Sequence, residues 1–502
     1  MSKKKTEAYL KPDSAKKNIL LQATYQFVIL GLPLIIAPYL TRVLGSNQLG
    51  IYSYTYSIAY YFVIFAMLGI KKHGQRIIAQ RKNDLSLLRK TFWSLLYVHL
   101  ASSVVVLIAY YVYVVFVCAN DKHIALIQGF YVASAVVDIT WFFYGIEKFK
   151  SVVLRNTLVK LCECICIFAF VKSPADLWKY TLIMSLSIFI GQAIMVPQVL
   201  HRIPRIKVSW SDIQEHFRPL ITLFIATIAI SLYTMFDRTL LGILSSKANV
   251  AYYEYSNKLI KIPETLIGVV GTVLFPRVCN LLAHQDIKSA QKYMKYSITF
   301  TMMIGFGAIF GLAAISKEFI ILYYGSDFAI CSSVMTMMTP LILIVGLGDV
   351  FRSQYLYPMK MDQKILKIIM INAAVNLVVS GLLIPKYGVY GAVIGTSLAE
   401  LTGFILEMIA SREVVDIKYI GKEFVIFACI GFAMYVILGG IQQLGAMDTV
   451  MSMVIRIVVG AVFYVACSFC YIAFFNEDVR NQVINLPVIR KVFNRRSKHN
   501  EI

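Results

Sequence analysis

About fourteen apolar stretches, each of roughly the twenty residues that a helix needs to cross a bilayer, run through almost the whole of this 502-residue chain. The composition agrees, since 58% of the residues are hydrophobic and only 15% are charged. The sequence therefore predicts an all-α polytopic membrane protein that works inside the bilayer. The expected spans are 18–41, 51–70, 92–117, 123–144, 152–171, 178–200, 219–243, 250–275, 296–315, 332–356, 366–384, 388–410, 423–440 and 450–475.

The distribution of Lys and Arg predicts the orientation. Of the 49 cations, about 36 lie in the two tails and the even-numbered connections, whereas the odd-numbered connections carry about seven. Because Lys and Arg in short loops mark the cytoplasmic side, we expect both termini in the cytoplasm. The clusters of Lys and Arg next to the apolar spans also explain the net charge of +22, because they can contact anionic membrane lipid. Nucleic acid is therefore not an expected partner.

Two distant segments resemble one another. Span 1 ends in Arg42-Val-Leu-Gly45, followed by Gly50–Tyr54, and span 7 ends in Arg238-Thr-Leu-Leu-Gly242, followed by Ala251–Tyr255. An even number of spans separates the copies, so both keep the same membrane orientation, as in transporters built from parallel repeats. Chance similarity of two interfacial segments is the alternative. The predicted order is a cytoplasmic basic tail (1–17), a six-helix lobe (18–200), a cytoplasmic linker (201–218), a second six-helix lobe (219–410), two extra helices (411–475) and a cytoplasmic basic tail (476–502).

The nine cysteines indicate neither disulfides nor metal ligands. Cys162, Cys164 and Cys166 recur at every second residue inside a span, which places them on different faces of the helix. We expect no metal and no cofactor. The longest outer connection, 316–331, is too short to hold a polymerase or glycosyltransferase site, and no loop carries a nucleophile or phosphate-loop motif, so an enzyme is not expected.

Several segments, taken in order, carry a family resemblance: Ala37–Gly45, Asp138–Lys150 with Arg155-Asn156, Asp237-Arg238, Phe275–Arg277 and Pro385–Ala392. With these segments the chain resembles the Wzx-type oligosaccharide flippases from about residue 15 to residue 475. These flippases belong to the multidrug/oligosaccharidyl-lipid/polysaccharide exporter superfamily, together with lipid II flippases and multidrug extruders.

The resemblance implies a transporter, which uses alternating access and makes or breaks no bond. Its substrate would be a polyprenyl-pyrophosphate-linked oligosaccharide repeat unit, moved from the inner to the outer leaflet of the bacterial cytoplasmic membrane for capsule or O-antigen-like polysaccharide. The implied partners are this lipid, membrane lipids, and a polymerase with other assembly proteins. Lipid II transport and extrusion of drugs or cations are the alternatives. An extruder concentrates acidic groups, whereas the deepest polar stripe here contains two lysines.

Ionisable residues inside the spans are the candidates for function, because a charge in the bilayer is costly. In span 8, Glu254, Lys258, Lys261 and Glu264 occupy about 120° of one helix face. Both lysines lie near the midplane, where two ammonium groups suit a pyrophosphate, and Pro263 beside them can break the helix there. The alternative is that each lysine only pairs with its neighbouring glutamate along the helix.

The remaining charged positions each have a structural and a functional interpretation. Arg42 and Arg238 end the two repeats at the outer face, where they either snorkel to the interface or contact substrate at an outer gate. Arg352 either pairs with Asp349 or meets the headgroup on the cytoplasmic side. Three further pairing or interfacial expectations are Asp138 with Arg155 or Lys148, Lys160 with Glu163, and Arg456 snorkelling near the outer end of span 14. Ion coupling is the alternative role for the carboxylates Asp138, Glu254 and Glu264.

The predicted orientation has a direct test. In a variant that lacks the native cysteines, single cysteines placed in 71–90 and 201–218 should react with an impermeant maleimide only after the inner face is opened. Single cysteines in 244–249 should react in intact cells, because that connection is expected outside. Opposite labelling of any of these segments would contradict the topology.

Overall fold

The computed structural model describes residues 15–118, 120–443, 449–476 and 479–480, so most of the predicted basic tails, 1–17 and 476–502, lies outside the described residues. Within these ranges every regular element is helical, which confirms the all-α prediction. The first half contains α2 (Ala15–Met67), α3 (Ile70–Arg81), α4 (Leu85–Phe116), α5 (Lys122–Val136), α6 (Thr140–Gly145), α7 (Phe149–Phe170), η1 (Pro174–Asp176), α8 (Leu177–Ala193), α9 (Met195–Leu200) and α10 (Trp210–Leu244). The second half contains α11 (Lys247–Ala283), α12 (Ile287–Tyr324), η2 (Ser326–Phe328), α13 (Ile330–Met338), α14 (Pro340–Phe351), the π-helical η3 (Arg352–Leu356), α15 (Asp362–Tyr387), α16 (Val389–Ala410), α17 (Ile417–Gln443) and α18 (Thr449–Phe475).

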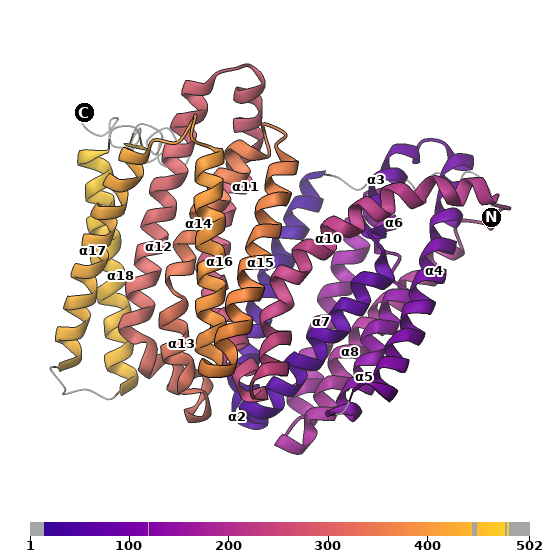
Figure 1. The fold of residues 1–502 in the computed structure, drawn as a ribbon, viewed down its shortest axis with the longest axis horizontal. Coiled ribbons are helices and arrows are strands. Elements are labelled where there is room, and N and C mark those ends of the chain that lie inside the picture. Colours follow the sequence, from indigo (N-terminus) through magenta and orange to yellow (C-terminus); the bar gives the residue numbers. More distant parts are fainter. Residues whose placement is uncertain (1–14, 119, 444–448, 477–478, 481–502) are drawn as a thin grey trace, which may run out of the picture. The chain divides into compact units, whose positions relative to one another are not determined.

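The chain divides into two compact units, Met1–Ala251 and Tyr252–Ile502, coloured from indigo to magenta and from magenta to yellow in Figure 1. In the first unit α2 packs against α4, α5, α7 and α10. In the second unit α12 packs against α14, α17 and α18, while α15 pairs with α16. The predicted lobe boundaries, with 201–218 as a linker, stay a prediction.

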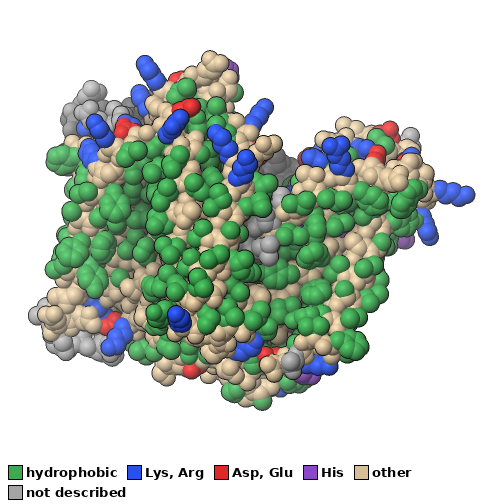
Figure 2. Space-filling model, viewed as in Figure 1, with side chains coloured by type: hydrophobic (Ala, Val, Ile, Leu, Met, Phe, Trp, Pro, Cys, Tyr) green, Lys and Arg blue, Asp and Glu red, His purple; other side chains and the backbone are tan. Residues whose placement is uncertain are grey.

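Membrane crossing is consistent with the lengths and composition of the helices. Eleven helical segments of the described residues are long and apolar enough to span a bilayer. The longest, Gly31–Arg81, holds the end of the first predicted span and all of the second, and α7 and α10 coincide with two further predicted spans. In Figure 2, hydrophobic side chains cover the middle of the C-terminal unit, and Lys and Arg side chains gather at its helix ends. The polytopic class is therefore confirmed.

Helix α2 bends between its two predicted spans at Gly45. This residue has φ 75° and ψ 172°, a conformation that is open essentially to glycine alone. The bend lets one chain segment leave the first span and begin the second without a loop.

Predicted span 4 is interrupted, because α5 ends at Val136 and the short α6 begins at Thr140. Asp138 causes the break: its carboxylate accepts hydrogen bonds from the backbone N–H (3.0 Å) and the hydroxyl (2.5 Å) of Thr140. Such local bonds compete with helical ones. The turn brings Trp141 against Gly74 of α3, where a Cβ would lie 2.7 Å from the indole ring.

The end of α10 and the first residue of α11 approach α2 closely at two glycines. A Cβ on Gly50 would lie 1.7 Å from the carbonyl oxygen of Lys247, and one on Gly242 would lie 1.9 Å from the ring of Tyr54. The Lys247 ammonium lies 3.2 Å from the centroid of the same ring and donates to the carbonyl of Gly242 at 3.0 Å. Gly242 and Tyr54, one from each of the two segments proposed as repeats, therefore pack against one another within the first unit.

In the second unit α17 begins beside α12. Asp416 accepts a hydrogen bond from the backbone N–H of Tyr419 and forms a 3.2 Å ion pair with Lys295, and both interactions lower the pKa of this carboxyl. Further along, Phe306, Phe427 and Tyr471 belong to one buried core. The two extra helices are thus packed directly onto α12.

Replacing Gly242 with Ala should destabilise the first unit, because its methyl group overlaps the Tyr54 ring. We expect a loss of about 1–3 kcal/mol, typical of overpacking, seen as a lower midpoint of thermal unfolding in detergent. Gly381→Ala is the control, since nothing lies within 4 Å of a Cβ there. Equal midpoints for both variants would contradict the close approach of α2 and α10.

Candidate functional site

The predicted polar stripe lies on α11 and is internally paired. The Lys258 ammonium is 3.5 Å from Glu254 and 4.1 Å from the centroid of Tyr255. The Lys261 ammonium is 2.5 Å from Glu264. Pairing along the helix is therefore present, and it leaves the Lys258 and Lys261 side chains 38% and 57% exposed. Pro263 does not break the helix, since α11 runs on through this residue to Ala283.

A second charged cluster surrounds Arg352 at the start of the π-helical turn. Its guanidinium lies 2.6 Å from Glu407 of α16 and 3.9 Å from Asp349 of α14. The Glu407 side chain is only 2% exposed, and a Cβ on Gly348 would lie 2.6 Å from its second oxygen. A π-helical turn inserted between α-helical segments is a feature that recurs at functional sites.

The stripe and the cluster are neighbours within the second unit. A Cβ on Gly271, two turns beyond Glu264 on the same face of α11, would lie 3.2 Å from the Asp349 carboxylate. Glu400 of α16 acts electrostatically on both Glu264 and Arg352. Together these residues form what we call the charged face, which carries more carboxylates than cations: Glu254, Lys258, Lys261, Glu264, Asp349, Arg352, Glu400 and Glu407.

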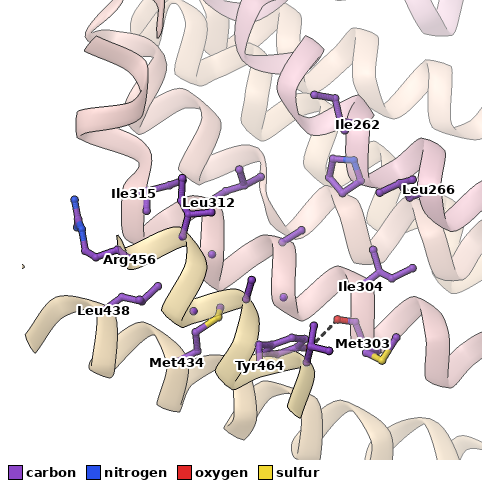
Figure 3. A pocket seen from close by; sticks show the side chains of 18 of the residues that line it. Ile262, Leu266, Met303, Ile304, Leu312, Ile315, Met434, Leu438, Arg456 and Tyr464 are labelled. Atoms are coloured by element: carbon purple, nitrogen blue, oxygen red, sulfur yellow. Dashed lines mark hydrogen bonds between the residues drawn. The ribbon is translucent and has the colours of Figure 1, made fainter. Parts of the chain in front are cut away.

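An apolar groove of about 430 Å³ lies beside the charged face, between α11, α12, α17 and α18. In Figure 3, Ile262 and Leu266 line one side, opposite Tyr464, whose hydroxyl donates to the carbonyl of Met303 at 2.7 Å. Gly307 and Gly311 of α12 leave the space open, because they present no side chain.

Arg456, at one end of the groove, does not snorkel as predicted. Its side chain is 1% exposed, lies 3.4 Å from Glu318 and donates to the carbonyl of Ala314 at 3.3 Å. The carboxylate on the neighbouring helix supplies a counter-charge, so the guanidinium need not reach the interface.

In the first unit the partner of Asp138 differs from the prediction. Its carboxylate pairs with Lys71 at 3.1 Å, whereas Arg155 donates to the side chain of Gln192 at 3.1 Å. The predicted pair of Lys160 and Glu163 is confirmed at 2.8 Å.

The two repeat-end arginines contact atoms of their own helices. Arg42 is exposed and donates to the carbonyl of Pro38 at 2.9 Å, and Arg238 donates to the sulfur of Met235 at 3.0 Å. Both lie in the first unit, whereas the other predicted binding residues, Lys258, Lys261 and Arg352, lie in the second.

Sequence reasoning missed Glu407 and the groove. Glu407 had a usable signal, since it is a carboxylate inside predicted span 12, and such a charge needs a partner. The sequence signal for the groove was weaker: Gly307 and Gly311 are two small residues four positions apart in an apolar span.

The polysaccharide biosynthesis protein family matches residues 15–282, more than half of the chain. The chain belongs to this family. It is 25% identical over 370 residues to a protein of Escherichia coli K12, covering 72% of this chain and 88% of that one. It is also 25% identical over 406 residues to a protein of Shigella dysenteriae, and this match covers 77% of this chain and 97% of that one. Both are named "Putative O-antigen transporter".

The fold of this family member matches solved transporters. An inward closed structure of the lipid II flippase MurJ superposes with a TM-score of 0.72 at 16% identity, covering 91% of this chain and 99% of that one. An inward-facing multidrug resistance transporter of the MATE family superposes with a TM-score of 0.58 at 12% identity. The match covers 79% of this chain and 96% of that one. These matches confirm the predicted polytopic all-α fold, and with the family match they confirm the predicted resemblance.

The pair of Arg352 and Glu407 should stabilise the second unit. Glu407→Gln leaves the guanidinium without its closest counter-charge, and removing one partner of a buried pair costs about 3–5 kcal/mol. We expect a lower unfolding midpoint in detergent. Glu400→Gln is the matched control, two turns earlier on the same helix, where no described residue forms an ion pair within 4 Å. Equal midpoints for both variants would contradict the role of the pair.

Proposed function

We propose that the protein translocates a polyprenyl-pyrophosphate-linked oligosaccharide repeat unit from the inner to the outer leaflet of the bacterial cytoplasmic membrane. The product would supply the synthesis of a capsule or O-antigen-like surface polysaccharide. Both termini are cytoplasmic in this proposal, and a polymerase takes over the repeat unit outside. Membership of the polysaccharide biosynthesis family and the names of the two relatives support this proposal.

The observation that carries the proposal is the position of α11. This one helix contributes Lys258 and Lys261 to the charged face and Ile262 and Leu266 to the apolar groove. A charged face beside an apolar groove suits a molecule with an anionic head and a long hydrocarbon tail. A polyprenyl pyrophosphate has these two parts.

In the proposed cycle the pyrophosphate replaces carboxylates as the partner of the cations. Lys258 and Lys261 are held by glutamates at 3.5 and 2.5 Å, so the resting charges are neutralised before substrate arrives. Arg352 would bind the headgroup on the cytoplasmic side, and Arg42 and Arg238 would contact it near the outer face. The carboxylates that are released, Glu254 and Glu264, and the separate Asp138 are the candidates for ion coupling.

The excess of carboxylates on the charged face favours a second candidate, the extrusion of a cationic compound by the same fold. Deleting the gene separates the two functions. We expect loss of one surface polysaccharide and accumulation of its lipid-linked repeat unit on the cytoplasmic leaflet, in viable cells. Unchanged glycans with increased drug sensitivity would indicate an extruder, and lysis with accumulated peptidoglycan precursor would indicate a lipid II flippase.

The double variant Lys258→Gln/Lys261→Gln should abolish polysaccharide export while its amount in the membrane stays normal, because both proposed cationic ligands are lost. Export is measured as surface polysaccharide in the deletion strain that carries each variant. Lys288→Gln, an exposed lysine of α12, is the control for loss of charge. Normal export by the double variant would leave the stripe with a structural role only.

A further inference from the structure

A second pocket lies in the first unit, where α3 meets the start of α10. Its volume is about 290 Å³, and unlike the groove it is lined mainly by polar and charged side chains. Residues of the predicted cytoplasmic segments 71–90 and 201–218 form most of it. The polar lining residues are His73, Arg76, Gln80, Arg81, Glu215 and His216.

A chain of hydrogen bonds assigns the protons of the two histidines. The hydroxyl of Ser94 donates to the carbonyl of Thr91 at 3.0 Å, so its oxygen accepts from Nε2 of His216 at 2.8 Å. Nδ1 of His216 is then an acceptor, and Nε2 of His73 donates to it at 3.0 Å. Neutral imidazole carries a single N–H. Nδ1 of His73 is therefore left as a bare lone pair.

This nitrogen has no partner among the described residues, although His73 is 3% exposed. A buried acceptor without a donor is costly. If His73 takes up a proton, Nδ1 becomes a donor instead, and the site then needs an acceptor, preferably an anion. His73 also lines the pocket, so a protonated ring there would favour an anionic ligand.

The charges around His73 favour an anion as well. From its own helix Arg76 and Arg81 act on the imidazole, and from α10 Glu215 and His216 do so, while α4 offers the uncharged Thr91 and Ser94. Arg81 is held by Glu215 at 2.8 Å and donates to the hydroxyl of Thr91 at 2.8 Å. Arg76 is exposed and forms no ion pair with a described residue, so its guanidinium is available to a ligand.

We propose that this pocket binds a phosphate or pyrophosphate group, with Arg76 and protonated His73 as its ligands. Arginine and imidazolium form strong charge-assisted bonds to such oxygens. Without the anion, burial and the neighbouring His216, Arg76 and Arg81 lower the pKa of His73 to about 4, so its imidazole is neutral at pH 6. With the anion bound, a proton on this imidazole is stabilised. The bound state therefore holds more protons than the empty one, and affinity rises as pH falls.

The anion has two possible sources, the headgroup of a lipid before transport or a free phosphate compound in the cytoplasm. The binding test needs no transport. Its failure and the failure of the proposed flippase activity are therefore distinguishable.

The experiment is calorimetric titration of the purified full-length protein in detergent with inorganic pyrophosphate, at pH 6 and at pH 8. His73→Gln keeps an N–H donor for His216 but cannot take up a proton. It should bind about ten-fold more weakly than the parent protein at pH 6, and no more weakly at pH 8. Comparing the two proteins at one pH cancels the titration of the probe itself. Arg76→Gln should weaken binding at both pH values, and Lys72→Gln, which removes a charge from the same helix outside the pocket, should not.

Equal binding by the parent protein and His73→Gln at both pH values would overturn the proposal, and so would a parent protein that does not bind pyrophosphate. Geranyl pyrophosphate is the second probe. Tighter binding of this probe than of pyrophosphate, lost in Arg76→Gln, assigns the pocket to a lipid headgroup. Equal binding of the two probes, equally sensitive to Arg76→Gln, assigns it to a soluble anion. Either result supports the anion site.

Discussion

Neutralisation of charge in an apolar medium is the constraint on which the rest of this structure depends. A charged side chain inside a bilayer is costly unless it finds a counter-charge or water. Three cations inside predicted spans follow this rule: Lys160 pairs with Glu163, Arg352 with Glu407, and Arg456 with Glu318. The pairs of Arg352 and Arg456 also tether different helices to one another, whereas Lys160 and Glu163 lie on the same helix. On the charged face, pairing also neutralises Lys258 and Lys261 with the glutamates of their own helix.

The same constraint gives α11 its central place. Its polar side brings two lysines and two glutamates to the charged face, and its other side joins the apolar groove with α12, α17 and α18. The two extra C-terminal helices are therefore more than an addition to the bundle, since Met434 and Tyr464 supply a wall of the groove. An amphiphile could lie with its head on one side of α11 and its tail on the other.

Local patterns predicted what depends on local geometry. Apolar length located the spans, and i, i+3 or i, i+4 spacing identified the pairs of Lys258, Lys261 and Lys160 with their glutamates. Partners on other helices could not be derived, because hydropathy carries no information about which helices are neighbours. Two predictions were wrong for this reason. Asp138 pairs with Lys71 of another helix and not with Arg155, and Arg456 pairs with Glu318 of another helix and does not reach the interface. Pro263 failed as a signal, because α11 continues through this residue and proline is tolerated inside membrane-spanning helices.

The central claim is transport of a pyrophosphate-linked oligosaccharide by the charged face. The most direct measurement is flipping of a fluorescent polyprenyl-pyrophosphate oligosaccharide in vesicles that contain only this protein, read as the fraction reached by a membrane-impermeant quencher. The account predicts protein-dependent flipping, with little of it left in Lys258→Gln/Lys261→Gln. Flipping no faster than in protein-free vesicles, or undiminished in that variant, would contradict it.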